Sequence, residues 1–170
     1  GCKYLIFRTS WVYAARGGNF AKTMLRLAQE RDKLTVINDQ HGAPTGADLI
    51  ADVTAHAMRL VLNPPSFPLG GVYHLVASGE TTWHGLASLA VQVALDAGVT
   101  LKAHPGAIQP ILAVEYPLPA PRPMNSRMST DKLHRVFAGR GDMSKLEQLN
   151  QPWDKAVRSY VTNLAKDGLI

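Results

Sequence analysis

The chain has 170 residues, of which 46% are hydrophobic and 18% are charged, and its net charge is +5. This length suits one domain with a proper core, and the composition is that of a globular protein. No run of Lys and Arg reaches five, and few aromatic residues lie among them, which argues against a nucleic-acid-binding surface. The positive charge fits either an anionic small ligand or simply a soluble surface.

The single cysteine, Cys2, allows no internal disulfide, so a cytoplasmic location is expected. No apolar stretch approaches the roughly 18 residues of a membrane span, and no membrane association is expected. The first residues lead directly into a strand-like run, without an initiator Met or a signal-peptide pattern. These features predict that the chain is a piece of a longer protein.

The hydrophobic pattern predicts alternating strands and helices over the first two thirds of the chain. Short apolar runs indicate buried strands, whereas apolar residues at helical spacing behind a capping residue indicate helices. The predicted strands cover residues 4–9, 34–37 and 72–76, and the predicted helices with their caps cover residues 19–32, 47–62 and 81–97. This alternation predicts an α/β fold.

The remaining third has a looser pattern. Residues 108–115 are predicted to form a strand, and the proline-rich residues 116–123 a loop. Ser129 or Thr130 is expected to cap a short helix through Phe137. A final helix is expected to start near Pro152, a favourable first-turn residue, and to run towards Lys166.

The motifs of a complete dehydrogenase are missing. No Gly-rich turn of the G-x-G-x-x-G type follows a strand, as dinucleotide binding would require. A short-chain reductase also needs a Tyr followed four residues later by a Lys that lowers the phenol pKa. The fourth residue after each tyrosine is never Lys; the tyrosines are Tyr4, Tyr13, Tyr73, Tyr116 and Tyr160. Catalysis by this chain alone is therefore not expected.

Other catalytic classes find no support either. The six histidines show neither paired helical spacing nor a cysteine partner, which argues against a zinc site. No Gly-x-Ser-x-Gly sequence is present, so a hydrolase triad has no basis.

Five separate stretches resemble one enzyme family, and they follow each other in the order found there. They are residues 5–13 (LIFRTSWVY), 19–24 (NFAKTM), 39–45 (DQHGAPT), 73–79 (YHLVASG) and 122–127 (RPMNSR). Together they resemble dTDP-4-dehydrorhamnose reductase, an extended short-chain dehydrogenase. The resemblance covers nearly the whole chain, because the five stretches extend from its first strand into its last third.

The resemblance implies an activity and a separation between a cofactor-binding half and a substrate-binding half. The family uses NADPH to reduce the 4-keto group of a dTDP-linked deoxyhexose, which yields dTDP-L-rhamnose for cell-surface polysaccharides. Its Rossmann cofactor half, with the Gly-rich loop and the Thr/Tyr/Lys catalytic group, precedes the matching region. Residues 1–37 are thus expected to be the end of the cofactor-fold sheet, and residues 38–170 a sugar-nucleotide-binding domain that is inactive in isolation.

The resemblance also implies a role for residues after the first strand. The Trp of the RTSWVY motif, Trp11, is expected to lie against the sugar, with a flat apolar ring face and an N–H donor. The alternative is a core tryptophan. Thr9 and Ser10 stand at the same strand end, where they either face the nicotinamide or pack internally.

Two further groups of residues are candidates for the nucleotide part of the ligand. Asn19 and Phe20 begin a helix, whose amino terminus favours a phosphate, although an ordinary cap and a core Phe explain them equally well. Gln40, Gly42 and Pro44 belong to a rigid loop that is able to present polar groups to a thymine edge or to serve as a structural turn.

Two arginines are candidates for the diphosphate. Arg122, fixed between prolines, is expected to bind it in a bidentate manner, with Arg127 as the second choice. The alternative for Arg122 is an ordinary surface arginine.

Asp48, in the first turn of a predicted helix, is a candidate for a Mg²⁺ site. The basis is that some members of the family dimerise through Mg²⁺ held by acidic residues of this domain; helix-dipole stabilisation is the simpler explanation. A homodimer or a self-associated form is expected, because the first strand would expose an edge that the missing sheet normally covers.

Two other functions stay open at this point. One is a different nucleotide-sugar enzyme of the same superfamily, such as an epimerase or a dehydratase. The other is a non-catalytic regulatory subunit resembling that of methionine adenosyltransferase, which would need no sugar-nucleotide pocket.

Overall fold

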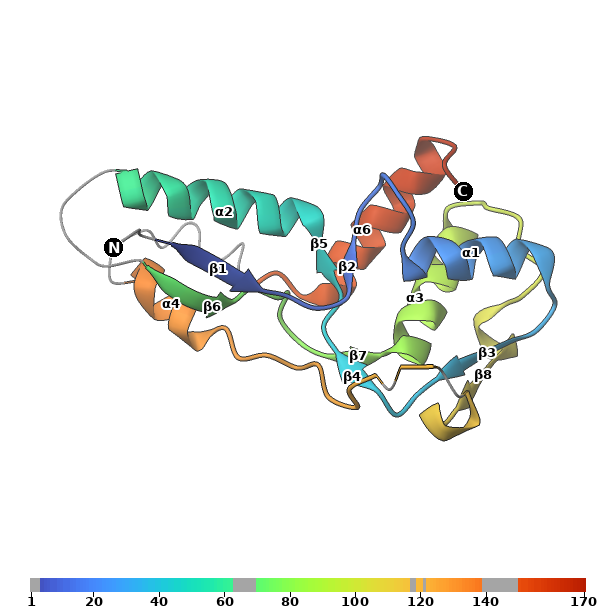
Figure 1. Ribbon diagram of the computed structural model, residues 1–170. Helices are drawn as coiled ribbons and strands as arrows, with labels where there is room; N and C mark the ends of the chain where they lie inside the picture. Colours follow the sequence, from blue (N-terminus) through green and yellow to red (C-terminus); the bar gives the residue numbers. More distant parts are fainter. Residues whose placement is uncertain (1–3, 63–69, 117–118, 121, 139–149) are drawn as a thin grey trace.

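Strands and helices alternate along the chain, which confirms the predicted α/β class (Figure 1). The computed structural model describes residues 4–62, 70–116, 119–120, 122–138 and 150–170. Cys2 and the proline-rich residues 63–69 lie outside these ranges.

The strands form pairs that join distant parts of the sequence. Three pairs are parallel (β1 with β6, β2 with β5, β3 with β8), and β4 pairs with β7 in antiparallel orientation. The strands are β1 Leu5–Arg8, β2 Val12–Tyr13, β3 Leu34–Ile37, β4 His41–Gly42, β5 Thr45–Gly46, β6 Gly71–His74, β7 Thr81–Thr82 and β8 Ile108–Ile111. Within the described ranges these pairs stay separate two-stranded sheets.

The helices begin and end within two residues of their predicted bounds. They are α1 Phe20–Glu30, α2 Ala47–Leu62, α3 Trp83–Asp96, α4 Asp131–Ala138 and α6 Trp153–Lys166, with short 3₁₀ turns at Pro105–Ala107 and Ala113–Glu115. In the part of the chain that the structure describes, none of them is both long and apolar enough to cross a bilayer.

The strand predicted over residues 108–115 is wrong in its second half. β8 stops at Ile111, and the 3₁₀ turn Ala113–Glu115 follows. The Glu115 carboxylate accepts the Leu112 N–H at 2.6 Å, which closes the turn directly after the strand.

One core cluster surrounds α3. This helix is rich in alanine, and the small side chains let α1 and α6 approach it closely. Ala87, Ala90 and Ala94 are fully buried there. The β3–β8 pair lies beside this cluster (Figure 1). Leu34 and Ile108 are buried members of the cluster.

A second cluster lies under α2, which runs along β1 and β6 (Figure 1). Leu5 and Phe7 of β1 pack into this cluster, whereas Ile6 between them is half exposed. The β1–β6 pair is therefore covered on one face, although parallel sheets are normally covered on both.

The division proposed between residues 37 and 38 stays a prediction. Two strand pairs join residues on opposite sides of this boundary, because β1 pairs with β6 and β3 pairs with β8. Core cluster membership therefore follows strand pairing rather than position along the chain.

Candidate functional site

Two short strand pairs bring the resemblance motifs together at one place. Pairing of β2 with β5 sets Val12 opposite Thr45, and the Thr45 N–H donates to the Trp11 carbonyl at 3.2 Å. Pairing of β4 with β7 sets Gly42 opposite Thr81, directly before α3. The loop of residues 38–45 is thus held between the Trp11 turn and the start of α3.

Trp11 is held between two neighbours, one on each face of its indole. The Trp83 ring stacks on it with a centroid distance of 3.7 Å and an angle of 16°. A Cβ on Gly42 would lie 2.6 Å from Cε2 of Trp11, nearer than to Cζ2 and Nε1, which are both bonded to Cε2, so Gly42 sits over a ring face. Since the Trp83 ring already fills one face, Gly42 covers the other. The face-on sugar contact expected for Trp11 is therefore not available in this conformation.

Trp83 is the residue that sequence reasoning missed. Its Nε1–H donates to Oε1 of Gln40 at 3.2 Å, and the Phe20 ring tilts against it with centroids 4.6 Å apart. Three of the predicted residues, Trp11, Phe20 and Gln40, thus meet on one unpredicted side chain. The available signal was a tryptophan directly after a helix-capping threonine, where helical periodicity does not say what the ring contacts.

A cavity of about 390 Å³ lies beside this aromatic cluster. Its wall includes Ala43, the neighbour of Gly42, together with Glu80 and Arg127. The loop around Arg127 is attached to β4 by two backbone hydrogen bonds, His41 N–H to Met124 O and Ser126 N–H to His41 O. The volume falls within the range of about 300–1,000 Å³ that is usual for small-molecule sites.

The two candidate arginines have different surroundings. Arg127 lies in the cavity wall, where its guanidinium donates to both Glu80 carboxylate oxygens at 3.1 and 3.3 Å. Arg122 is exposed and is not part of the cavity wall among the described residues. The geometry favours Arg127, the second choice from sequence, as the cation nearest to a ligand in this cavity.

Several predicted side chains point into the protein. Pro44 is fully buried and Gln40 is 4% exposed. The Ser10 hydroxyl donates to the Ala43 carbonyl at 3.3 Å, and Oγ1 of Thr9 is buried without a hydrogen-bond partner among the described residues. The roles expected of Thr9 and Ser10 towards a nicotinamide stay predictions.

Asn19 acts as the cap of α1. Its Oδ1 accepts the Lys22 N–H at 3.1 Å, and its Nδ2 donates to the Ala14 carbonyl and to the Tyr160 hydroxyl, both at 2.9 Å. Its side chain is thus fully used in joining α1 to α6. A phosphate at this helix start remains a prediction.

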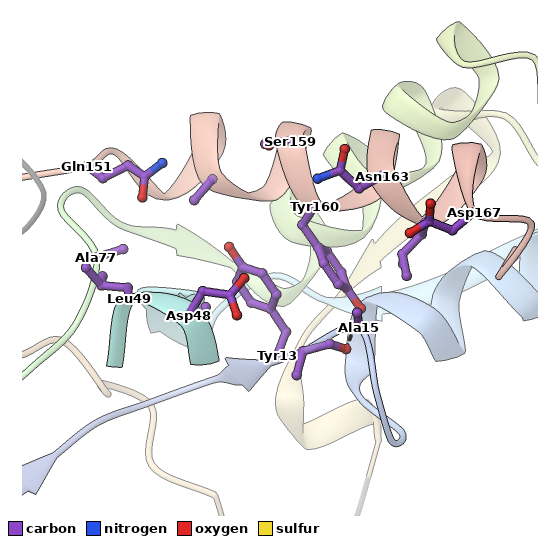
Figure 2. A pocket seen from close by; sticks show the side chains of 14 residues that line it. Tyr13, Ala15, Asp48, Leu49, Ala77, Gln151, Ser159, Tyr160, Asn163 and Asp167 are labelled. Carbon is purple, nitrogen blue, oxygen red and sulfur yellow. Dashed lines mark hydrogen bonds between the residues drawn. The ribbon is translucent and has the colours of Figure 1, made fainter. Parts of the chain in front are cut away.

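A second cavity, of about 250 Å³, opens beside this junction (Figure 2). Tyr13 and Tyr160 stand together in its wall with ring centroids 4.7 Å apart. Burial raises the pKa of Tyr13 well above its ordinary 10.0, and repulsion from Tyr160 and Asp48 adds to the rise. Burial raises the pKa of Tyr160 as well, partly offset by the Asn19 hydrogen bond. Both phenols therefore stay neutral, the opposite of the lowered pKa that a catalytic reductase tyrosine needs.

Asp48 lies in the wall of the second cavity, as does Asp167 from the end of α6 (Figure 2). Mg²⁺ prefers several oxygen ligands in octahedral geometry. Among the described residues, however, no group of three or more His, Cys, Asp or Glu side chains comes close enough to hold a metal ion. The residues that the structure describes thus do not form a Mg²⁺ site by themselves.

The arrangement as a whole defines an α/β ligand-binding domain. The loop of residues 38–45 and the loop around Arg127 adjoin one cavity, whose charged wall residues are Glu80 and Arg127. The aromatic cluster lies next to this cavity through Gly42 and its neighbour Ala43. The Arg127 guanidinium in this wall suits a ligand with anionic groups.

Comparison with known proteins identifies the family. The sequence matches the RmlD substrate binding domain over residues 1–165, and the chain belongs to this family. It is 59% identical over 162 residues to a dTDP-4-dehydrorhamnose reductase of Salmonella typhimurium, covering 95% of this chain and 50% of that protein. A second dTDP-4-dehydrorhamnose reductase, from Sinorhizobium fredii, is 40% identical over 167 residues, covering 97% of this chain and 51% of that protein.

Solved structures agree. A dTDP-4-dehydrorhamnose reductase from Clostridium acetobutylicum superposes with a TM-score of 0.74 at 27% identity, covering 95% of this chain and 49% of that one. The reductase from Bacillus anthracis, in complex with NADP, superposes with a TM-score of 0.69 at 28% identity, again covering 95% of this chain and 49% of that one. The chain thus spans about half the length of the relatives it matches.

Proposed function

We propose that the protein containing this chain reduces dTDP-4-dehydro-L-rhamnose to dTDP-L-rhamnose with NADPH, in the cytoplasm and for polysaccharide synthesis. In this proposal the chain supplies the sugar-nucleotide-binding part. Family membership and the names of the relatives support it. The observation that carries it is structural: each of the five resemblance motifs contributes at least one residue to the Trp11–Trp83 cluster or to the wall of the adjoining cavity.

NADPH would be held mainly by residues outside this chain. The chain offers neither a Gly-rich phosphate-binding turn nor a Tyr with a Lys four residues later. The chain therefore does not contain a complete dinucleotide site, and Thr9 and Ser10 are its proposed contribution beside the nicotinamide. NADPH, when bound, supplies the hydride; the task left to this chain is to bind and orient the sugar nucleotide.

The proposed contacts follow from the cavity beside the aromatic cluster. Because both faces of the Trp11 indole are covered, its N–H edge is the part available to a sugar hydroxyl or keto oxygen. Arg127 is placed to bind the diphosphate by exchanging its Glu80 partner, and Arg122 is a second cation on the same loop. Gln40 and Pro44 are buried in the same loop as Ala43 of the cavity wall, and this loop is proposed for the thymine side of the ligand.

Trp11→Ala in the full-length reductase is expected to raise KM for the dTDP-sugar about 3–10-fold, the equivalent of one lost hydrogen bond. KM for NADPH should stay the same, because Trp11 is proposed to contact only the sugar. Steady-state kinetics with each substrate varied in turn measures both constants. Tyr116→Ala, which removes an exposed aromatic ring, is the matched control. An unchanged KM for the sugar in Trp11→Ala would refute the proposed contact.

The isolated chain is expected to show no reductase activity and to self-associate. Turnover requires the groups that this chain lacks, whereas Tyr4 and Ile6 on the uncovered face of β1 and Leu62 on α2 remain exposed and apolar. An assay with NADPH and the keto sugar tests the first point, and light scattering tests the second. Turnover by the 170 residues alone, or a strictly monomeric species, would contradict the respective expectation.

A further inference from the structure

The Trp11 backbone adopts an unusual conformation that its surroundings must maintain. Its φ is +49°, in the left-handed region that non-glycine residues rarely enter, and it is the one such residue in the described ranges. Strained residues of this kind persist when neighbouring structure determines their position. Thr45 fixes the backbone of Trp11 through its carbonyl, but the side chain is fixed by ring packing alone.

The Trp83 side chain, in contrast, is anchored from several directions. It is the first residue of α3, whose cap Thr82 accepts the Gly85 N–H at 3.0 Å and donates to Oδ1 of Asn38 at 2.7 Å. Its own N–H is taken by the nearly fully buried Gln40. Trp83 thus links the helix start, the loop of residues 38–45 and the Trp11 turn.

The two indoles play unequal parts in this stack. The N–H of Trp83 is already hydrogen-bonded, whereas the N–H of Trp11 forms no hydrogen bond to any described residue and stays available. Gly42 closes the opposite face of Trp11, so the ring has no freedom to tilt away from Trp83. The direction of the available N–H is therefore set by the plane of Trp83.

We propose that Trp83 is a positioning residue for sugar-nucleotide binding, which acts by holding the Trp11 indole edge towards the ligand. This inference rests on the proposed role of Trp11. Trp83 is not a substrate contact itself; the aromatic plane, rather than its N–H, carries the effect.

The test is a mutant cycle in the full-length reductase with Trp11→Ala, Trp83→Leu and the double variant. Trp83→Leu is expected to raise KM for the dTDP-sugar about 2–10-fold, the range of one aromatic pair, with kcat and KM for NADPH nearly unchanged. The double variant should match Trp11→Ala, because Trp83 has nothing left to position. Trp83→Phe keeps an aromatic plane and should restore most of the affinity.

Each outcome separates the two proposals. If Trp11→Ala leaves the sugar KM unchanged, the proposed role of Trp11 fails first. If Trp11→Ala raises KM but Trp83→Leu does not, or if the two effects multiply in the double variant, the positioning role is overturned. The positioning role is also overturned if Trp83→Phe raises KM for the dTDP-sugar as much as Trp83→Leu does. Should Trp83→Leu fail to fold, Trp83→Met takes its place, since it fills the volume without an aromatic plane.

Discussion

Phe137→Ala is expected to lower the free energy of unfolding of this chain by about 3–5 kcal/mol, the usual cost of truncating a buried Phe. The Phe137 ring on α4 is 1% exposed and meets the His56 ring of α2 edge-on at 5.2 Å. It packs in the same cluster as Leu133 and Tyr73. Its removal leaves a cavity within this second cluster, where α4 meets α2.

Thermal or urea unfolding measures the change. A loss of this size corresponds to a fall in melting temperature of roughly 6–20 °C for a chain of this length. Val114→Ala is the control, because Val114 is 79% exposed and its truncation should change stability by less than about 0.5 kcal/mol. A Phe137→Ala chain that melts like the Val114→Ala control would show that α4 is not part of the core.

Gly42→Ala is expected to destabilise the chain by about 1–3 kcal/mol and to disturb the binding site at the same time. The new Cβ would lie 2.6 Å from a Trp11 ring atom, a separation at which one of the two must move. The ring cannot retreat, because Trp83 stacks on its other face. The pairing of β4 with β7 in turn holds Gly42 in place.

Gly18→Ala offers a matched control for this change. A Cβ on Gly18 meets nothing within 4 Å, and its φ is not in the left-handed region. The same substitution there should be neutral or stabilising by up to about 1 kcal/mol. Melting temperature and near-UV circular dichroism, which reports the tryptophan packing, distinguish the two variants. Equal melting temperatures and near-UV spectra of Gly42→Ala and Gly18→Ala would contradict the packing of Trp11 between Trp83 and Gly42.

The sequence predicted the elements better than their contacts. Helix α2 matches its predicted range because a continuous apolar face and a following proline pair define both ends locally. β8 was predicted too long, because an apolar run continues past the point where Glu115 closes a turn. Pairing of β1 with β6 depends on contacts between distant residues, which no local pattern encodes.

The candidate site shows the same division. Trp11, Phe20 and Gln40 were selected through family resemblance, and the structure brings them together. Their common neighbour Trp83 has no distinguishing local signal, because its contacts come from three separate segments. The preference for Arg127 over Arg122 likewise needed the cavity, since both arginines lie in one motif and differ only in surroundings.

Two parallel strand pairs join segments that lie far apart in the sequence, and this affects how the chain folds. β1 meets its partner only beyond α2, and β3 meets its partner only beyond α3, so neither pair is able to form as a local hairpin. Closing such long loops costs entropy before any contact repays it, which makes folding slow compared with a helical bundle of similar length. During that delay the strand edges and the apolar face of β1 stay open to other chains, so folding competes with aggregation.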